Sequence, residues 1–139
     1  MIFKEIERNN EELRERAKLS VIPELGNHFI SIDDFTINYI LMDEDEIVGG
    51  IDFRLSIPEA DLLFIYIRKD LRGKGYSKTL LDESLKELSN KGVHKVFLEV
   101  DNTNSKALSL YNSYGFKRIS VRKHYYDNGN DAIIMMKEF

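Results

Sequence analysis

An uncharged apolar run at residues 62–67, Leu-Leu-Phe-Ile-Tyr-Ile, is followed directly by a turn with two glycines and then by a helical pattern. A short run without charge is typical of a strand that is buried on both faces. The helix is indicated by four leucines on one stripe and a glycine stop, namely Leu80, Leu81, Leu85, Leu88 and Gly92. The sequence therefore predicts a strand, a tight turn and a helix in immediate succession.

The turn, Arg72-Gly73-Lys74-Gly75-Tyr76-Ser77, has the properties of an anion-binding loop. Glycines allow the backbone to turn tightly, and the start of a helix presents successive N–H groups at the positive end of the helix dipole. We therefore expect a phosphate or a pyrophosphate to bind here. A glycine-rich turn that binds no ligand is the alternative.

Three known phosphate-loop patterns can be compared with this turn. The Walker pattern requires a spacing that is absent, and the dinucleotide pattern G-x-G-x-x-G has Lys78 at its third glycine position. The third pattern, R-x-x-G-x-G/A, is met by Arg72 and Gly75, with Ser77 at the final small position. In this respect the segment resembles the pyrophosphate loop of the GNAT superfamily of N-acetyltransferases, which use acetyl-coenzyme A.

A second match lies downstream, where residues 93–100 are predicted to form a strand that leads into another helix. Thr103 or Asn104 is expected to cap this helix and Gly115 to end it. Residues 98–116 resemble the pattern L-E-V-x-x-x-N-x-x-A-x-x-L-Y-x-x-x-G-F of RimI-type protein N-terminal acetyltransferases. Further on, R-x-x-Y-Y and D-A-x-x-M of the same proteins are matched at residues 122–126 and 131–135.

The resemblance implies an α/β (α+β mixed) fold of the GNAT type, with a central mixed, mostly antiparallel sheet flanked by helices. The expected element order is β-α-β-β-β-α-β-α-β-β, in a single N-acetyltransferase domain of residues 1–139. The first helix is expected to begin after Asn10 and to break at Pro23 and Gly26. Residues 21–24 would then form a loop at one wall of the acceptor groove.

The resemblance also implies where acetyl-coenzyme A binds. The backbone of the apolar strand would hold the acetyl-pantetheine arm, and the glycine turn would hold the pyrophosphate. Asn104 corresponds to a family asparagine that contacts the pantetheine, with Ala107 and Tyr111 on the same helical face. The implied coenzyme residues are Ile65, Tyr66, Ile67, Arg72, Gly73, Lys74, Gly75, Tyr76, Ser77, Lys78, Asn104 and Ala107, and no metal is expected.

Two residues would carry the chemistry of direct attack by an amine on the thioester. Glu99 is a carboxylate in an apolar strand, and we expect it to be buried, where it would accept a proton near neutral pH. The alternative is a structural carboxylate that pairs with a lysine or caps a helix. Tyr111 would protonate the departing thiolate, whereas the alternative for it is a core aromatic residue.

Three further residues are expected to contact the acceptor. Tyr125 and Tyr126 would point to opposite faces if they continue a strand, and in relatives this pair helps to hold the peptide backbone. Hairpin stabilisation is the alternative role for the pair. Asp61 begins the coenzyme strand, at a position that faces the acceptor in relatives. By contrast, the acidic turn at residues 43–46 is expected to be a solvated hairpin tip, not a metal site.

Composition excludes several other functions. A net charge of −4 argues against general nucleic-acid binding, and the absence of cysteine excludes a thiolate metal site and an acyl-cysteine route. No apolar run has membrane-spanning length and no signal peptide is evident, so we expect a cytoplasmic monomer or homodimer. The expected acceptor is a protein N-terminus. A small amine, such as a polyamine, an amino sugar or an antibiotic, and a coenzyme-A-binding sensor without turnover are the alternatives.

Overall fold

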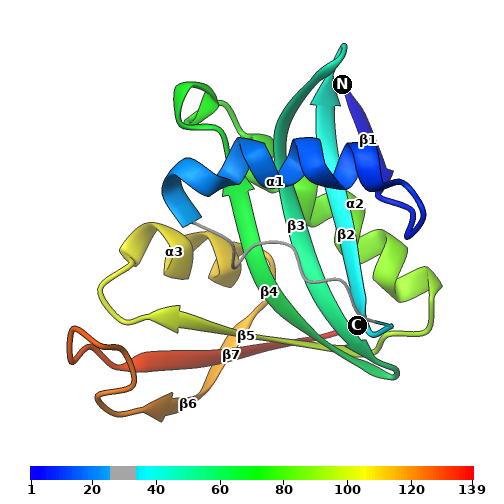
Figure 1. Cartoon of the computed structure of the whole chain (residues 1–139). Helices are drawn as coiled ribbons and strands as arrows, with labels where there is room; N and C mark the ends of the chain where they lie inside the picture. Colours follow the sequence, from blue (N-terminus) through cyan, green and yellow to red (C-terminus); the bar gives the residue numbers. More distant parts are fainter. Residues whose placement is uncertain (26–33) are drawn as a thin grey trace.

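The computed structural model describes residues 1–25 and 34–139, with the backbone alone for residues 20–25. In this part of the chain, seven strands form one sheet in the order β1-β2-β3-β4-β5-β7-β6 (Figure 1). Only the β4–β5 pair is parallel among these neighbours. The strands are β1 (Ile2–Glu5), β2 (Thr36–Asp43), β3 (Glu46–Ser56), β4 (Glu59–Ile67), β5 (Lys95–Asp101), β6 (Lys117–Arg122) and β7 (Ala132–Glu138).

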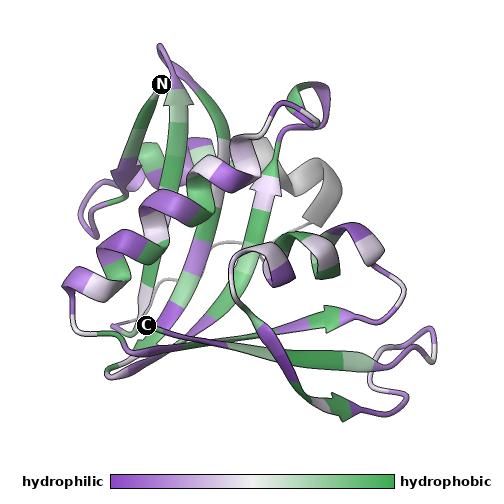
Figure 2. Ribbon diagram, turned by 180° about the vertical axis from the view of Figure 1, so that it is seen from behind, coloured by the Kyte–Doolittle hydropathy of each residue, from purple (hydrophilic) through white to green (hydrophobic). Residues whose placement is uncertain are grey.

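Helices lie on both faces of this sheet. They are α1 (Glu11–Leu25), the short 3-10 helix η2 (Lys69–Leu71), α2 (Tyr76–Asn90) and α3 (Ser105–Ser113). Figure 1 shows α1 in front of the central strands and α2 behind them, and Figure 2 gives the view from behind, with α2 and α3 banded in purple and green. The element order agrees with the predicted one, so the expected mixed fold is confirmed.

The alternation of side chains along each strand explains why apolar residues pack on both faces of the sheet. On β2, Ile37, Tyr39 and Leu41 belong to the main core with α2, whereas Ile40 and Met42 pack with Leu13 and Ala17 of α1. Successive side chains of a strand point to opposite faces, so one apolar strand supplies both layers. No helix in residues 1–25 and 34–139 is long and apolar enough to cross a membrane.

The predicted helix ends are confirmed with one exception. Asn10 accepts the Leu13 N–H at 3.1 Å, and Gly92 ends α2 in the left-handed region at φ 96°. Pro23, however, does not break the first helix, because α1 continues to Leu25, so the loop predicted at residues 21–24 is wrong. Gly26 lies outside the described residues.

A bulge in β4 opens the sheet. Asp52 of β3 is opposite Phe64 and Phe53 is opposite Leu62, which leaves Leu63 as the extra residue. Bulges bend a strand and increase its twist. The parallel pairing of β4 with β5 covers Glu59–Asp61 and Lys95–Phe97, and the two strands then diverge (Figure 1).

This divergence corrects one prediction about the apolar run. Leu63, Phe64 and Ile65 are only half-buried, although a strand covered on both faces was expected. Beyond Asp61, the edge of β4 that faces β5 has no strand partner in the described part of the chain. The apolar run therefore borders open space instead of a neighbouring strand.

Candidate active site

A groove of about 330 Å³ lies beside the diverging part of β4. It is bordered by the end of β4, the first turn of α2 and the exposed side of α3. Seven residues predicted to bind coenzyme line it, together with two that sequence reasoning missed, Lys106 and Leu110. The seven are Ile65, Tyr66, Ile67, Arg72, Ser77, Asn104 and Ala107. Helical spacing from Asn104 could have identified Leu110, because it lies on the same face as Ala107.

The glycine turn that precedes α2 is exposed and has the conformation that the sequence predicts. Gly73 and Gly75 have φ values of 80° and 85°, in the left-handed region that favours glycine. An added Cβ at either position would meet nothing within 4 Å, so the backbone conformation is the constraint, not space. α2 begins at Tyr76, and the first N–H groups of a helix have no acceptor within it.

Arg72 holds this turn against the end of β4. Its Nε donates to the Ile67 carbonyl at 3.0 Å, and its guanidinium lies 5.8 Å from the centre of the Tyr66 ring. Lys74 and Lys78 are exposed on either side of Gly75. The turn thus presents positive charge and backbone N–H groups together, which is the combination that binds phosphate.

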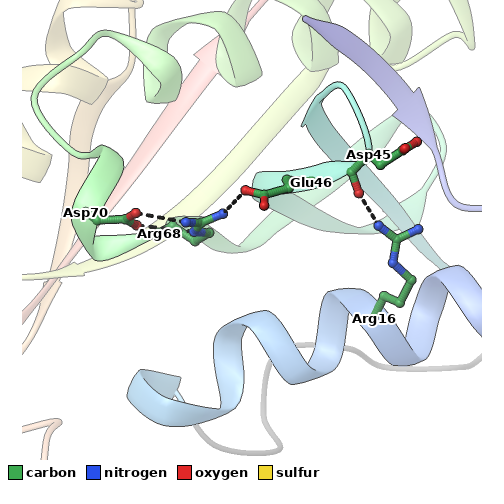
Figure 3. A network of polar contacts seen from close by, with 5 residues as sticks. All are labelled: Arg16, Asp45, Glu46, Arg68 and Asp70. Carbon is green, nitrogen blue, oxygen red and sulfur yellow. Dashed lines mark hydrogen bonds and ion pairs between the residues drawn. The ribbon is translucent and has the colours of Figure 1, made fainter.

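A polar network that sequence reasoning missed joins this region to the β2–β3 hairpin (Figure 3). Arg68 pairs with Glu46 at 2.9 Å and with Asp70 of η2 at 2.8 Å, and Arg16 of α1 donates to the Asp45 carbonyl. The hydrogen bond from Arg68 lowers the pKa of Asp70. The acidic turn is therefore partly paired, and the described residues contain no cluster suited to a metal ion.

Asn104 performs the capping role that the sequence allowed for it. Its side chain accepts the Ala107 N–H at 3.2 Å and so fixes the first turn of α3. Gly115 follows the helix at φ 88°, as predicted. The groove side of α3 is therefore held in place at its start by a residue that also lines the groove.

A second cavity, of about 750 Å³, brings together the predicted base and the three predicted acceptor residues. Glu99 comes from β5, Asp61 from β4, and Tyr125 and Tyr126 from the loop after β6. No short sequence pattern links these segments. The tertiary fold places them around one space because β4, β5 and the β6–β7 connection meet there.

The expected burial of Glu99 is wrong. Its side chain is 34% exposed, and its carboxylate lies 3.6 Å from Nη1 of Arg122. Strand alternation explains this, because Leu98 and Val100 point into the core and Glu99 points to the opposite face. The carboxylate therefore faces the cavity directly.

Asp61 faces the same cavity from the neighbouring strand. Burial raises the pKa of Asp61, as do Glu59 and Glu99, while Arg54 lowers it. Asp61 pairs with Phe97 across the parallel β4–β5 ladder, and Glu99 follows two residues later on the same face. The cavity therefore holds two carboxylates together with two guanidinium groups, those of Arg54 and Arg122.

Tyr125 and Tyr126 do not continue a strand, so the condition for their pointing to opposite faces is not met, although Tyr125 is exposed. β6 ends at Arg122, and the following turn places both rings at the cavity, 5.2 Å apart between centroids and nearly perpendicular. His124, just before them, has a positive φ of 51°, which redirects the chain. The predicted turn at residues 127–130 is present: the Gly129 N–H donates to the Tyr126 carbonyl.

Tyr111 lies in the main core next to the groove residue Leu110. It is 6% exposed and packs edge-on to Phe116, with ring centroids 5.7 Å apart. Burial raises the pKa of Tyr111 to about 12, so the phenol keeps its proton at neutral pH. This core placement agrees with the structural alternative for Tyr111.

The two cavities adjoin along β4. Residues 62–64 line the larger cavity, and residues 65–67 line the groove. A molecule that lies in the groove with its end at Phe64 would therefore reach the cavity that holds Glu99. This arrangement suits a transfer reaction between two bound molecules.

Comparisons with known proteins identify the family of this chain. The model of the acetyltransferase (GNAT) family matches residues 3–116. The [ribosomal protein bS18]-alanine N-acetyltransferase of Escherichia coli K12 is 32% identical over 102 residues, which are 71% of this chain and 69% of that protein.

Solved structures share the fold. A crystal structure of the ribosomal-protein-S18-alanine N-acetyltransferase from E. coli has a TM-score of 0.80 at 23% identity and covers 99% of this chain and 92% of that one. An aminoglycoside 6'-N-acetyltransferase complexed with coenzyme A has a TM-score of 0.84 at 17% identity, over 99% and 97% of the two chains. This chain therefore belongs to the GNAT family of N-acetyltransferases, enzymes that use acetyl-coenzyme A as the donor.

Proposed function

We propose that this enzyme acetylates the N-terminal α-amine of a protein or peptide. The observation that carries the proposal is the larger cavity, where Glu99, Asp61, Tyr125 and Tyr126 surround the end of the coenzyme groove. The bS18-alanine N-acetyltransferase that resembles this chain is named for such a reaction. This cavity holds two carboxylates, two guanidinium groups and two aromatic rings, and its carboxylates would receive the ammonium group of a peptide.

The residues of the groove fit acetyl-coenzyme A, which supplies the acetyl thioester when bound. The exposed turn from Arg72 to Lys78 would hold the pyrophosphate through N–H groups and positive charge. The end of β4 at Ile65, Tyr66 and Ile67, which has no described strand beside it on the side of β5, would hold the pantetheine arm, with Asn104 and Ala107 on the opposite wall. A hydrogen-bonding strand edge that lines a groove can bind an extended chain.

Glu99 is proposed to accept the proton of the acceptor amine, directly or through a water. Its carboxylate faces the cavity, and the guanidinium of Arg122, 3.6 Å away, orients it. General bases of this kind act at hydrogen-bond distance from the proton that they remove. Exposure to the cavity makes this access simpler than the burial that the sequence suggested.

Tyr111 is proposed to supply a proton to the departing sulfur. Its pKa of about 12 keeps the phenol protonated, and its neighbour Leu110 lines the groove. The role is carried over from the family pattern. Tyr111→Phe would separate this role from a purely structural one, because the substitution should lower kcat while leaving the fold intact.

The acidity of the acceptor favours an α-amine. A peptide α-amine has a pKa near 7.8, so roughly one molecule in seven is neutral at pH 7, compared with about one in 2,500 for a lysine side chain near 10.4. One carboxylate base is therefore better matched to an α-amine. Tyr125 and Tyr126 would pack against the first residues of the acceptor.

A comparison of acceptors tests the proposal. The purified enzyme would be incubated with acetyl-coenzyme A and one of three acceptors: a peptide with a free N-terminus, the same peptide with a blocked N-terminus and an internal lysine, or a small polyamine or amino sugar. Mass spectrometry would locate the acetyl group. Acetylation of the free N-terminus alone supports the proposal, whereas equal acetylation of the blocked peptide or a preference for the small amine would refute it.

One substitution and its control test the role of Glu99. Glu99→Gln should lower kcat about a hundredfold or more with little change in the KM for acetyl-coenzyme A. Glu83→Gln on the outer surface of α2 is the matched control. Full kcat in Glu99→Gln would remove Glu99 from the mechanism without affecting the family assignment.

A further inference from the structure

The C-terminal strands β5, β7 and β6 have one face packed on α3 and an opposite face that is more exposed. Leu98, Ile133 and Met135 point toward α3 and are buried in the main core. The residues between them point the other way and are half-buried: Phe97, Ile134 and Met136. Two of these three, Phe97 and Ile134, line the larger cavity, so the exposed face is continuous with it.

Carboxylates and guanidinium groups both lie at the cavity end of this face, those of Asp61 and Glu99 and those of Arg54 and Arg122. The opposite edge of the face is cationic. The edge strand β6 and the residue after it contain four cations and no carboxylate: Lys117, Arg118, Arg122 and Lys123. Arg122 pairs with Glu99 and Lys123 pairs with Asp131, whereas Lys117 and Arg118 have no ion pair to any residue that the structure describes.

The strand register assigns Lys117 and Arg118 to opposite faces. Lys117 is opposite Met136, which is opposite Phe97, so these three share the cavity face. Arg118 is opposite Met135, so it belongs to the face that packs on α3. Two adjacent cations of the same strand thus differ in whether they can meet an acceptor that leaves the cavity.

The distance from the reaction centre to Lys117 follows from sheet geometry. Lys117 lies two strands across the sheet and two residues along it from Glu99. With ~4.8 Å between strands and ~3.4 Å between residues, the two Cα atoms are about 12 Å apart. An extended peptide advances about 3.3 to 3.6 Å per residue. A peptide that runs across the sheet from the cavity therefore brings roughly its third to fifth residue near Lys117.

We propose that this face selects acceptors with an acidic side chain at about the third to fifth position, and that Lys117 is the residue that contacts this side chain. The inference rests on the proposed function. The amine end of such a peptide would meet the carboxylates of Asp61 and Glu99, and its acidic side chain would meet the cation of Lys117 on the edge strand. Electrostatic complementarity of this kind sets partner choice more than affinity.

Three peptides would test the proposal. They share one sequence except at the third to fifth positions, which carry glutamate, glutamine or lysine. We expect kcat/KM for the glutamate peptide to exceed that for the lysine peptide about threefold to tenfold, the range of an exposed ion pair replaced by a repulsive one. The preference should shrink at high salt, because salt screens exposed charges.

Charge reversal locates the selection. Lys117→Glu should reverse the preference between the glutamate and lysine peptides, and Lys117→Gln should abolish it. Arg118→Glu makes the same change in net charge on the other face, and it should retain the wild-type preference. Equal loss of preference in both reversals would refute a specific role for Lys117, and circular dichroism would verify that each variant is folded.

The outcomes separate this inference from the function on which it rests. Equal kcat/KM for all three peptides in the wild type would overturn the inference and leave N-terminal acetylation standing. No acetylation of any free N-terminus would overturn both.

Discussion

Asp52 is a buried carboxyl group in the middle of β3, and it makes the stability of this enzyme depend on pH. Its side chain is 1% exposed and lies between Asn38 of β2 and Phe64 of β4. Neither carboxyl oxygen has a hydrogen-bond partner within bonding distance among the residues that the structure describes. Burial raises the pKa of Asp52 to about 7, and the nearby Asn38 amide offsets part of that effect. We expect Asp52→Asn to stabilise the protein above neutral pH.

The magnitude follows from proton linkage. The pKa of Asp52 is higher in the folded protein, about 7, than its ordinary value of 3.8, so the folded state binds more protons between these values. The stability that the neutral carboxyl allows is therefore present below pH 3.8 and is lost as the pH rises toward 7. A shift of about three units at 1.36 kcal/mol each corresponds to about 4 kcal/mol, of which about 3 kcal/mol falls between pH 4.5 and 8.5.

Urea unfolding measured by far-ultraviolet circular dichroism gives this quantity, since the chain contains no tryptophan to report by fluorescence. The free energy of unfolding of Asp52→Asn minus that of the wild type should increase by about 3 kcal/mol over this pH range. Asp43→Asn, at the exposed end of β2, is the matched control for the chemical change. A difference for Asp52→Asn that stays constant with pH would show that the carboxyl does not titrate as its burial requires.

Two further changes test the packing of β4 and the network ahead of the coenzyme turn. Gly49→Ala places a Cβ 2.2 Å from the Tyr66 carbonyl oxygen and should cost about 3 kcal/mol or more in thermal unfolding. Gly129→Ala, at a φ of 84° with nothing within 4 Å, should cost only about 1 kcal/mol, and equal losses would refute the steric explanation. Arg68→Met removes the ion pairs that fix Asp70 and should raise the KM for acetyl-coenzyme A about twofold to fivefold at similar kcat. An unchanged KM would mean that the coenzyme turn does not depend on this network.

Local signals in the sequence were sufficient for the backbone of the glycine turn and for the cap of α3. Gly73 and Gly75 have the left-handed conformation that the glycine turn requires, and Asn104 caps α3 as its position indicates. These features depend on the φ preference of glycine and on a side chain within three residues of its partner. Such interactions are encoded by neighbours in the chain, so a pattern of a few residues predicts them.

The surroundings of Glu99, Tyr125 and Tyr126 were predicted less well, because the residues that line the larger cavity come from distant segments. Glu99 was expected to be buried from its apolar neighbours, yet its face of β5 is open, and Tyr125 and Tyr126 share one cavity because the chain leaves β6 before reaching them. Neither outcome can be derived from residues nearby in sequence. Both depend on the course of neighbouring strands.

The sequence by itself determined the order of strands and helices, the glycine turn before α2 and the residue that caps α3. Only the tertiary structure decided which side chains face one another around the groove and the cavity. The physical reason is the extra residue Leu63, which bends β4 away from β5 after Asp61 and opens the sheet between a groove and a cavity. That bulge is defined by the register between β3 and β4, a relation between two strands that neither strand specifies alone.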